Sequence, residues 1–298
     1  MTDWKFAGET PPRAEEEWLA EFAKYKASPE FKAINRGMQL DDFKFIYWME
    51  WAHRMWGRAL GLVFVVPAVY FTARGAVKGP LAARLGLLGA MGGAQGLVGW
   101  WMVRSGLEEP TEAHASPRVS PYRLASHLAS AFTIFGLLLW TTMSLSLPHQ
   151  PSAPSVAAAG ALRGLRRHAL PLTGLIALTA ASGAFVAGND AGHAYNTFPL
   201  MNGHWIPEDY ITLPGWRNAF ESTGAVQLHH RGLAVTTLTA TLAVWAAHSS
   251  RRALPKDVRR LLHALAAMAG LQVSLGISAL LSYVPPALLD AKNMRSIL

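Results

Sequence analysis

Three histidines stand close to where long apolar stretches of the chain begin: His53, His127 and His230. Ionisable side chains inside membrane spans are costly and usually functional. Two imidazoles from different helices are enough to hold a heme iron between them. A single histidine of this kind is more often a polar residue hydrogen-bonded between helices, but three at one depth favour iron ligation.

Zinc is the competing metal for these histidines. A zinc site needs three or four clustered ligands, often with His-x-x-x-His spacing. The chain contains neither that spacing nor any cysteine, so heme is favoured. Nearby arginines could pair with heme propionates, although snorkelling toward the membrane interface is the alternative interpretation. These arginines are Arg54, Arg58, Arg123 and Arg231.

An acid lies beside the first of the histidines. Glu50 precedes His53 by three residues, so both project from the same face of a helix. A carboxylate beside a heme could shuttle protons, whereas the alternative is an ordinary solvated side chain at the membrane interface. The corresponding position beside His230 is Gln227, which suggests one catalytic half and one binding half.

The elements that must carry these residues are membrane-spanning helices. The chain has 298 residues, of which 51% are hydrophobic and only 15% charged, a balance too apolar for an ordinary soluble domain. Runs of about 18 to 25 apolar residues have the length that crosses a bilayer. We expect an all-α integral membrane protein with about six spans, near residues 55–73, 84–103, 123–146, 169–187, 226–248 and 261–284.

The net charge of +8 reflects topology and not a nucleic-acid partner, because the charges alternate between connections. The connections after the first, third and fifth spans are rich in Lys and Arg, and their only acid is Asp257. The other connections are dominated by Asp and Glu. The positive-inside rule places the basic connections on the cytoplasmic or matrix face, and hence the three histidines near the opposite face.

An internal repeat with an offset of 177 residues relates the two halves of the chain. Glu50-x-x-His53-Arg54 recurs as Gln227-x-x-His230-Arg231, and Gln95-x-x-x-Gly99 recurs as Gln272-x-x-x-Gly276. We therefore expect two pseudo-symmetric helical bundles. Symmetry implies eight spans, with a first and a last helix absent here. The expected divisions are a polar segment at 1–48 on the acidic-loop face, a first half at 49–146, a linker at 147–167 and a second half at 168–298.

Longer motifs make a family recognisable. The chain resembles the eukaryotic and proteobacterial heme A synthase family along essentially its whole length. The motifs are Tyr25-Lys26-x-Ser28-Pro29-Glu30-Phe31-Lys32, Asp42-Phe43-Lys44 continuing to Met49-Glu50-x-x-His53-Arg54-Met55-Trp56-Gly57-Arg58, Tyr122-Arg123-Leu124-Ala125-x-His127, Ser182-Gly183-Ala184-Phe185-Val186-Ala187-Gly188 and Tyr195-Asn196-Thr197-Phe198-Pro199.

The resemblance implies conversion of heme O to heme A by oxygen-dependent oxidation of the C8 methyl group to formyl, in the mitochondrial inner membrane or a bacterial cytoplasmic membrane. It implies that His53 and His127 bind the substrate heme, that His230 belongs to a heme b site and that Glu50 is functionally important. The implied partners are membrane lipid, a ferredoxin-type electron donor, heme O synthase and cytochrome oxidase assembly factors, with a homo-oligomer also possible.

Two departures from the family pattern leave alternatives open. A helix is expected before Met1, and Lys292 stands about where the family places a fourth histidine. The chain is therefore expected to be truncated at both ends. The alternative functions are a b-type heme protein that only transfers electrons, or an inactive heme-binding assembly factor.

Overall fold

In the computed structural model, the residues described are 10–33, 35–108, 117–147 and 155–282. These residues form helices and connecting loops, and their only β-type pairing is an isolated bridge between Met201 and His204. The chain divides into two compact units, Met1–Ser146 and Leu147–Leu298. The all-α class predicted from the sequence is confirmed.

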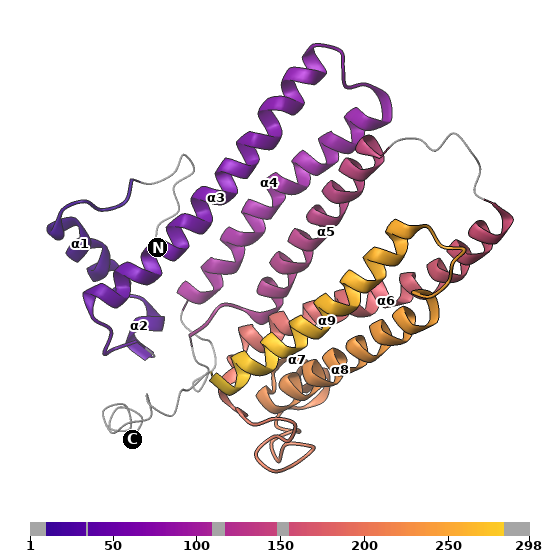
Figure 1. Ribbon diagram of the computed structural model, residues 1–298. Helices are drawn as coiled ribbons and strands as arrows, with labels where there is room; N and C mark the ends of the chain where they lie inside the picture. The colour runs from indigo at the N-terminus through magenta and orange to yellow at the C-terminus, as the bar shows by residue number, and fades with distance from the viewer. Residues whose placement is uncertain (1–9, 34, 109–116, 148–154, 283–298) are drawn as a thin grey trace. The chain divides into compact units, whose positions relative to one another are not determined.

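The described residues of the first unit form five helices, three of them long. Helix α4 packs against both α3 and α5, so it lies between them (Figure 1). The short helices α1 and α2 pack on each other, α1 also packs on α3, and α2 contacts α4. The bounds are α1 Glu15–Lys26, α2 Pro29–Ala33, α3 Leu40–Ala73, α4 Gly79–Leu107 and α5 Pro121–Ser146.

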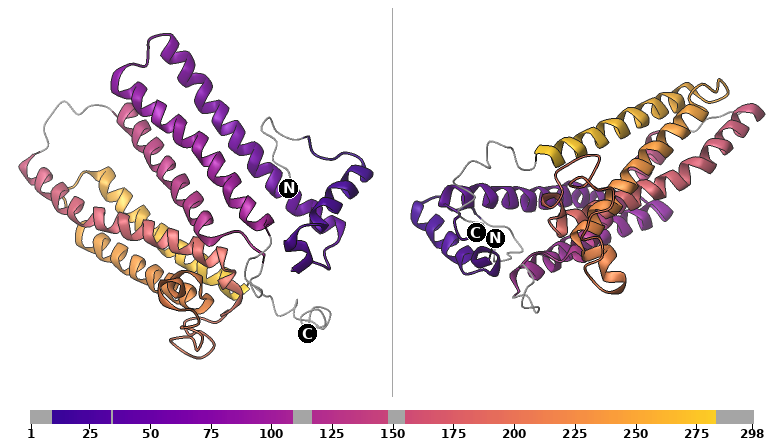
Figure 2. Two further views of the ribbon diagram at one scale, coloured as in Figure 1. Left: turned by 180° about the vertical axis from the view of Figure 1, so that it is seen from behind. Right: turned by 90° about the horizontal axis from the view of Figure 1, so that it is seen from below.

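The second unit is built around α8, which packs against α6 on one side and α9 on the other. A long connection that contains only short helical turns joins α6 to α8 and folds at one end of the unit (Figure 2). The bounds are α6 Val156–Gly188, η1 Ala191–His193, η2 Gly215–Arg217, α7 Asn218–Glu221, α8 Thr223–His248 and α9 Lys256–Ser282.

All six predicted spans are long helices. Five of them, α3, α4, α5, α6 and α9, are long and apolar enough to cross a membrane. Helix α8 has 26 residues but is more polar, because it carries three histidines, an arginine and several threonines. Residues 283–284 of the last predicted span, and Lys292, lie outside the described residues.

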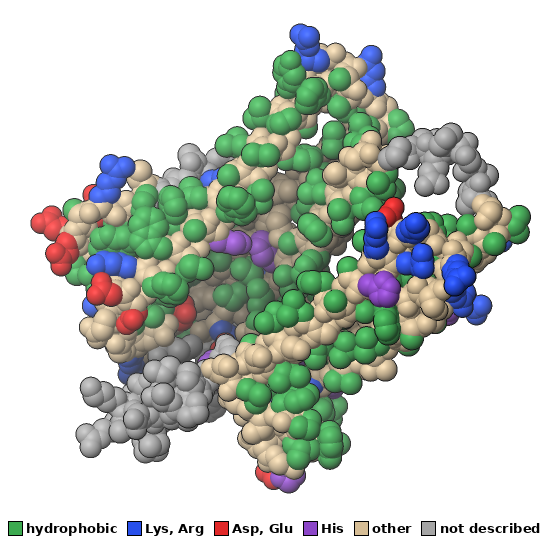
Figure 3. Space-filling model, viewed as in Figure 1, with side chains coloured by type: hydrophobic (Ala, Val, Ile, Leu, Met, Phe, Trp, Pro, Cys, Tyr) green, Lys and Arg blue, Asp and Glu red, His purple; other side chains and the backbone are tan. Residues whose placement is uncertain are grey.

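The long helices expose apolar side chains that a soluble protein would bury. Val63 is 71% exposed on α3 and Phe135 is 63% exposed on α5. Hydrophobic side chains cover the length of these helices, while Lys and Arg gather at helix ends (Figure 3). Such a surface is stable when lipid covers it. The protein is therefore an integral membrane protein.

Two element boundaries differ from the sequence prediction. Helix α3 begins at Leu40, inside the segment 1–48 that we expected to precede the first half. Helix α6 begins at Val156, so the second part of the expected linker 147–167 is helical. Ser155 caps this helix, because its Oγ accepts a hydrogen bond from the backbone N–H of Ala158 at 3.2 Å. The alanine-rich composition that we interpreted as a linker also favours a helix.

The repeat is visible in the helix boundaries. Helices α4 and α9 begin at Gly79 and Lys256, positions separated by the same 177 residues that relate the sequence motifs. The two members of the Gln repeat, however, have different surroundings. Gln95 is half-buried and donates to the backbone carbonyl of His127 at 2.8 Å, whereas Gln272 is exposed.

An aromatic cluster fixes the beginning of α3. Trp18, Phe22 and Tyr25 of α1 are buried against Phe43 and Tyr47 of α3. The rings of Phe22 and Phe43 are stacked with centroids 5.0 Å apart. Aromatic side chains contribute large buried areas, so this cluster anchors the part of α3 that immediately precedes the candidate site.

Candidate heme-binding site

In the first unit, two histidines lie on the helices that flank α4. His53 belongs to α3 and is exposed, while His127 belongs to α5 and is partly buried. The two imidazoles are close enough for their charges to interact. His127 also packs on Gly99 of α4, where an added Cβ would lie 2.9 Å from its Cε1. The structure therefore brings together the two histidines that the sequence predicts as a pair.

The surroundings of His127 fit a ligand-binding role. Its Nδ1 is buried and has no hydrogen-bond partner among the described residues. With Nδ1 enclosed by protein, Nε2 is the ring nitrogen left to bind an iron. In the part of the chain that the structure describes, no three His, Asp or Glu side chains gather into a metal cluster.

Glu50 forms an ion pair with Arg54 one turn further along α3. Both side chains are mostly shielded, with 26% of Glu50 and 19% of Arg54 exposed. The ion pair places a carboxyl group on the same helix as His53 and beside a cation. The acid predicted from the sequence therefore has a fixed cationic partner.

The other two candidate arginines of the first unit, Arg58 and Arg123, contact neighbouring helical residues. Arg123 donates to the backbone carbonyl of Trp101 at 2.7 Å, and its guanidinium lies 4.5 Å from the centre of the Trp101 ring. The Nη1 of Arg58 lies 4.0 Å from the sulfur of Met55. Arg123 thus joins the beginning of α5 to the end of α4, and its contact with a propionate stays a prediction.

In the second unit, His230 lies between α8 and α6. Its Nδ1 is 2.7 Å from the Oγ of Ser182. A Cβ added at Gly183 would lie 3.2 Å from the Cε1 of the imidazole. A metal-binding histidine commonly has one ring nitrogen fixed by a hydrogen bond and the other available to the metal, and His230 fits that pattern. The sequence contained Ser182 and Gly183 within a family motif, but nothing there revealed their contact with His230.

Arg231 fastens the loop between α6 and α8. Its Nη2 donates to the backbone carbonyl of Tyr195 at 2.8 Å and to Oε1 of Gln227 at 3.0 Å. Its Nη1 lies 3.4 Å and 3.5 Å from the carbonyl oxygens of Pro199 and Leu200. The guanidinium therefore holds the loop in place. The predicted pairing with a propionate remains a prediction.

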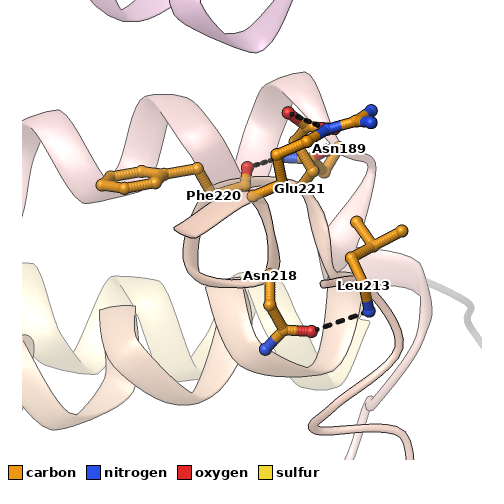
Figure 4. A network of polar contacts seen from close by, with 6 residues as sticks. Asn189, Leu213, Asn218, Phe220 and Glu221 are labelled. Carbon is orange, nitrogen blue, oxygen red and sulfur yellow. Dashed lines mark hydrogen bonds and ion pairs between the residues drawn. The ribbon is translucent and has the colours of Figure 1, made fainter. Parts of the chain in front are cut away.

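Further contacts fold this loop over the ends of its helices. Asn189 donates to the carbonyl of Phe220 at 2.9 Å, and the Oδ1 of Asn218 accepts from the backbone N–H of Leu213 at 3.1 Å (Figure 4). Gln227 donates to the carbonyl of Ala191 at 2.6 Å. Gln227, which stands at the position of Glu50 in the repeat, therefore helps to hold the loop on α8. This contact explains why an amide suits that position.

Tyr195 and Asp209 join two parts of the loop through a hydrogen bond from the phenol to the carboxylate. Desolvation is the main cause that raises the pKa of Tyr195 to about 12, and the hydrogen bond and negative charge of Asp209 add to it. An added Cβ at Gly224, in the first turn of α8, would lie 2.3 Å from Oδ1 of Asp209. A glycine at this position allows the loop to approach the helix.

A second pair of histidines lies in the second unit, far along α8 from His230. The Nδ1 of His168 and the Nε2 of His248 are 3.0 Å apart, and His248 is fully buried. The pair connects the basic end of α6 to the end of α8. Sequence reasoning missed it, because the two residues are separated by 80 positions and belong to no common motif.

Comparison with known proteins identifies the family of the chain. A family model described as cytochrome oxidase assembly protein, COX15-CtaA, matches residues 1–294. Heme A synthase COX15 of Arabidopsis thaliana is 51% identical over 289 residues, which cover 97% of this chain and 63% of that relative. Heme A synthase COX15 of Mus musculus is 48% identical, with 97% and 69% covered. Heme A synthase of Rhodospirillum centenum is 46% identical, with 95% and 73% covered.

No solved structure matches the chain. The chain spans 63% of the length of its Arabidopsis relative, so the likeness concerns that part of the longer protein. Family model and relatives agree over nearly all of the residues present here. The chain therefore belongs to the COX15-CtaA family of cytochrome oxidase assembly proteins.

Proposed function

We propose that this protein is a heme A synthase, which oxidises the C8 methyl group of heme O to a formyl group. The observation that carries the proposal is the placement of His53 and His127 on α3 and α5, the two helices that pack against α4. Its relatives bear the name heme A synthase. Two imidazoles of this kind suit a porphyrin iron.

In this proposal, some residues of the first unit bind the heme and one transfers protons. His53 and His127 hold the substrate heme O, and Glu50 accepts or returns protons as the methyl group is oxidised. Arg54 holds the carboxyl group of Glu50 in place through their ion pair. When bound, the hemes supply the redox-active iron, and the protein supplies orientation and electrostatics. His230 of the second unit would hold a heme b.

We further propose that the oxidation depends on oxygen and draws electrons from a ferredoxin-type donor. The five apolar helices place the reaction in a membrane, which we assign to the mitochondrial inner membrane or, in a bacterium, the cytoplasmic membrane. There the protein would receive heme O from heme O synthase and act alongside other cytochrome oxidase assembly factors.

The test is expression of the chain beside a source of heme O, followed by extraction of the hemes and mass analysis. A product carrying the formyl group is expected from the wild type and not from His53→Ala or His127→Ala. His204→Ala is the matched control, because His204 is exposed in the loop of the second unit. Equal formyl production by all four proteins would contradict the assignment of the two histidines.

The description of the family favours one further candidate, a heme-binding assembly factor without chemistry on the porphyrin. A b-type electron-transfer protein would behave in the same way in this assay. Either function predicts tight heme binding with unchanged heme O. That result would replace the enzymatic proposal.

A further inference from the structure

We propose that Ser182 is a positioning residue that fixes the tautomer of His230 and makes the second unit the tighter of two heme sites. The inference rests on the proposed function, since it concerns the heme that His230 would hold. It assigns a role to a hydroxyl on α6 that belongs to no ligand set. It also explains how one chain could keep one heme while exchanging another.

The hydrogen bonds of Ser182 decide the direction of its contact with His230. The Oγ of Ser182 donates to the backbone carbonyl of Thr179 at 2.7 Å, one turn back along α6. The carbonyl can only accept and the hydroxyl has a single proton, so both contacts form together only when Nδ1–H of His230 donates to this Oγ, 2.7 Å away. His230 then carries its proton on Nδ1, and its Nε2 keeps the lone pair that an iron requires.

The packing around His230 prevents the ring from leaving this position. Gly183 lies so close to the ring that even a Cβ would come within 3.2 Å of Cε1. The hydroxyls of Thr179 and Thr237 lie 2.7 Å apart and connect α6 to α8 close to the imidazole. Orientation and tautomer are therefore both set before a heme binds, which lowers the entropic cost of ligation.

His127 in the first unit has no such support. Its ring packs on a glycine, Gly99, in the same manner, but its Nδ1 has no hydrogen-bond partner among the described residues. A hydrogen bond from Nδ1–H to an oxygen raises the basicity of the coordinating nitrogen. His230 is thus the stronger ligand and His127 the weaker one. A weaker ligand suits a substrate that must leave as product.

The sharpest test compares Ser182→Val with Ser182→Thr. The two side chains have nearly the same shape, and only threonine keeps the hydroxyl. The heme-loaded full chain would be mixed with excess apomyoglobin to measure heme loss from the second unit, and titrated to obtain the midpoint potential. We expect the valine variant to lose heme about 10- to 100-fold faster than the threonine variant. Its potential should be higher, because a less basic imidazole stabilises ferric iron less.

Two controls separate this inference from the proposed function. His230→Ala identifies the spectral signal of the second unit, and Ser274→Ala removes a hydroxyl that donates to the carbonyl of Gly270 on its own helix, α9. If the wild type binds no heme at all, the proposed function fails. If the wild type binds heme through His230 but the valine and threonine variants lose it equally fast at equal potential, only the role of Ser182 is overturned.

Discussion

Gly99 on α4 and His127 on α5 are in contact so close that no side chain fits between them. A Cβ at position 99 would lie 2.9 Å from Cε1 and 3.4 Å from Nδ1 of the imidazole. Helix α4 therefore forms one wall of the space around His127, and the wall is made of backbone. The sequence showed Gly99 only as one member of a repeated Gln-x-x-x-Gly pattern.

Substitution of Gly99 by alanine is expected to displace His127. The overpacking should cost about 1–3 kcal/mol of stability, which exceeds the gain of up to about 1 kcal/mol that alanine brings in a helix. Gly96→Ala is the matched control, since nothing lies within 4 Å of a Cβ at that position. The measurement is the thermal unfolding temperature of both variants in detergent. Gly96→Ala should unfold at or above the temperature of the wild type, and Gly99→Ala below it. The reverse order would refute the close contact.

Neutralising Glu50 is expected to stop the chemistry and leave heme binding intact. Glu50→Gln retains a polar group beside Arg54 but loses the ability to take up a proton. Formyl production should fall by about 100-fold or more, as for a lost general acid or base. The measurement is mass analysis of extracted hemes together with the heme content of the purified protein. Asp41→Asn, an exposed acid on the same helix, serves as the control and should match the wild type.

Gly224→Ala is expected to loosen the loop between α6 and α8. The new Cβ would overlap Oδ1 of Asp209 and break its hydrogen bond with Tyr195. The expected loss is about 1–3 kcal/mol of stability. Limited proteolysis of the loop and thermal unfolding measure it, with Gly232→Ala on the same helix as control, because that position is open. Equal protease resistance of both variants would argue against the contact.

The loop should also weaken at alkaline pH. The raised pKa of Tyr195, about 12 against an ordinary value of 10.0, means that folding favours the neutral phenol. Its contribution to stability is complete below pH 10.0 and disappears as the pH rises through about 12. The difference between the tyrosinate absorbance titrations of the wild type and Tyr195→Phe isolates this group. A difference curve centred at the ordinary value would show that the phenol is not held by Asp209.

The sequence by itself determined the membrane class, the six long helices and the identities of the candidate ligands. Apolar runs of spanning length leave few alternatives to helices in a bilayer, because the backbone must satisfy its hydrogen bonds internally. We expected a linker at residues 147–167, and the structure includes residues 156–167 in helix α6, which Ser155 caps. Capping is a local feature that a compositional interpretation overlooks.

Only the tertiary structure decided what surrounds each imidazole. His127 and His230 look alike in the sequence, yet within the described residues Nδ1 of His127 has no hydrogen-bond partner and Nδ1 of His230 lies beside a serine hydroxyl on a neighbouring helix. Arg231 looked like a propionate partner and is engaged by loop carbonyls. These contacts join residues tens of positions apart, and the helix rotations that create them depend on packing between helices, which periodicity along one helix does not encode.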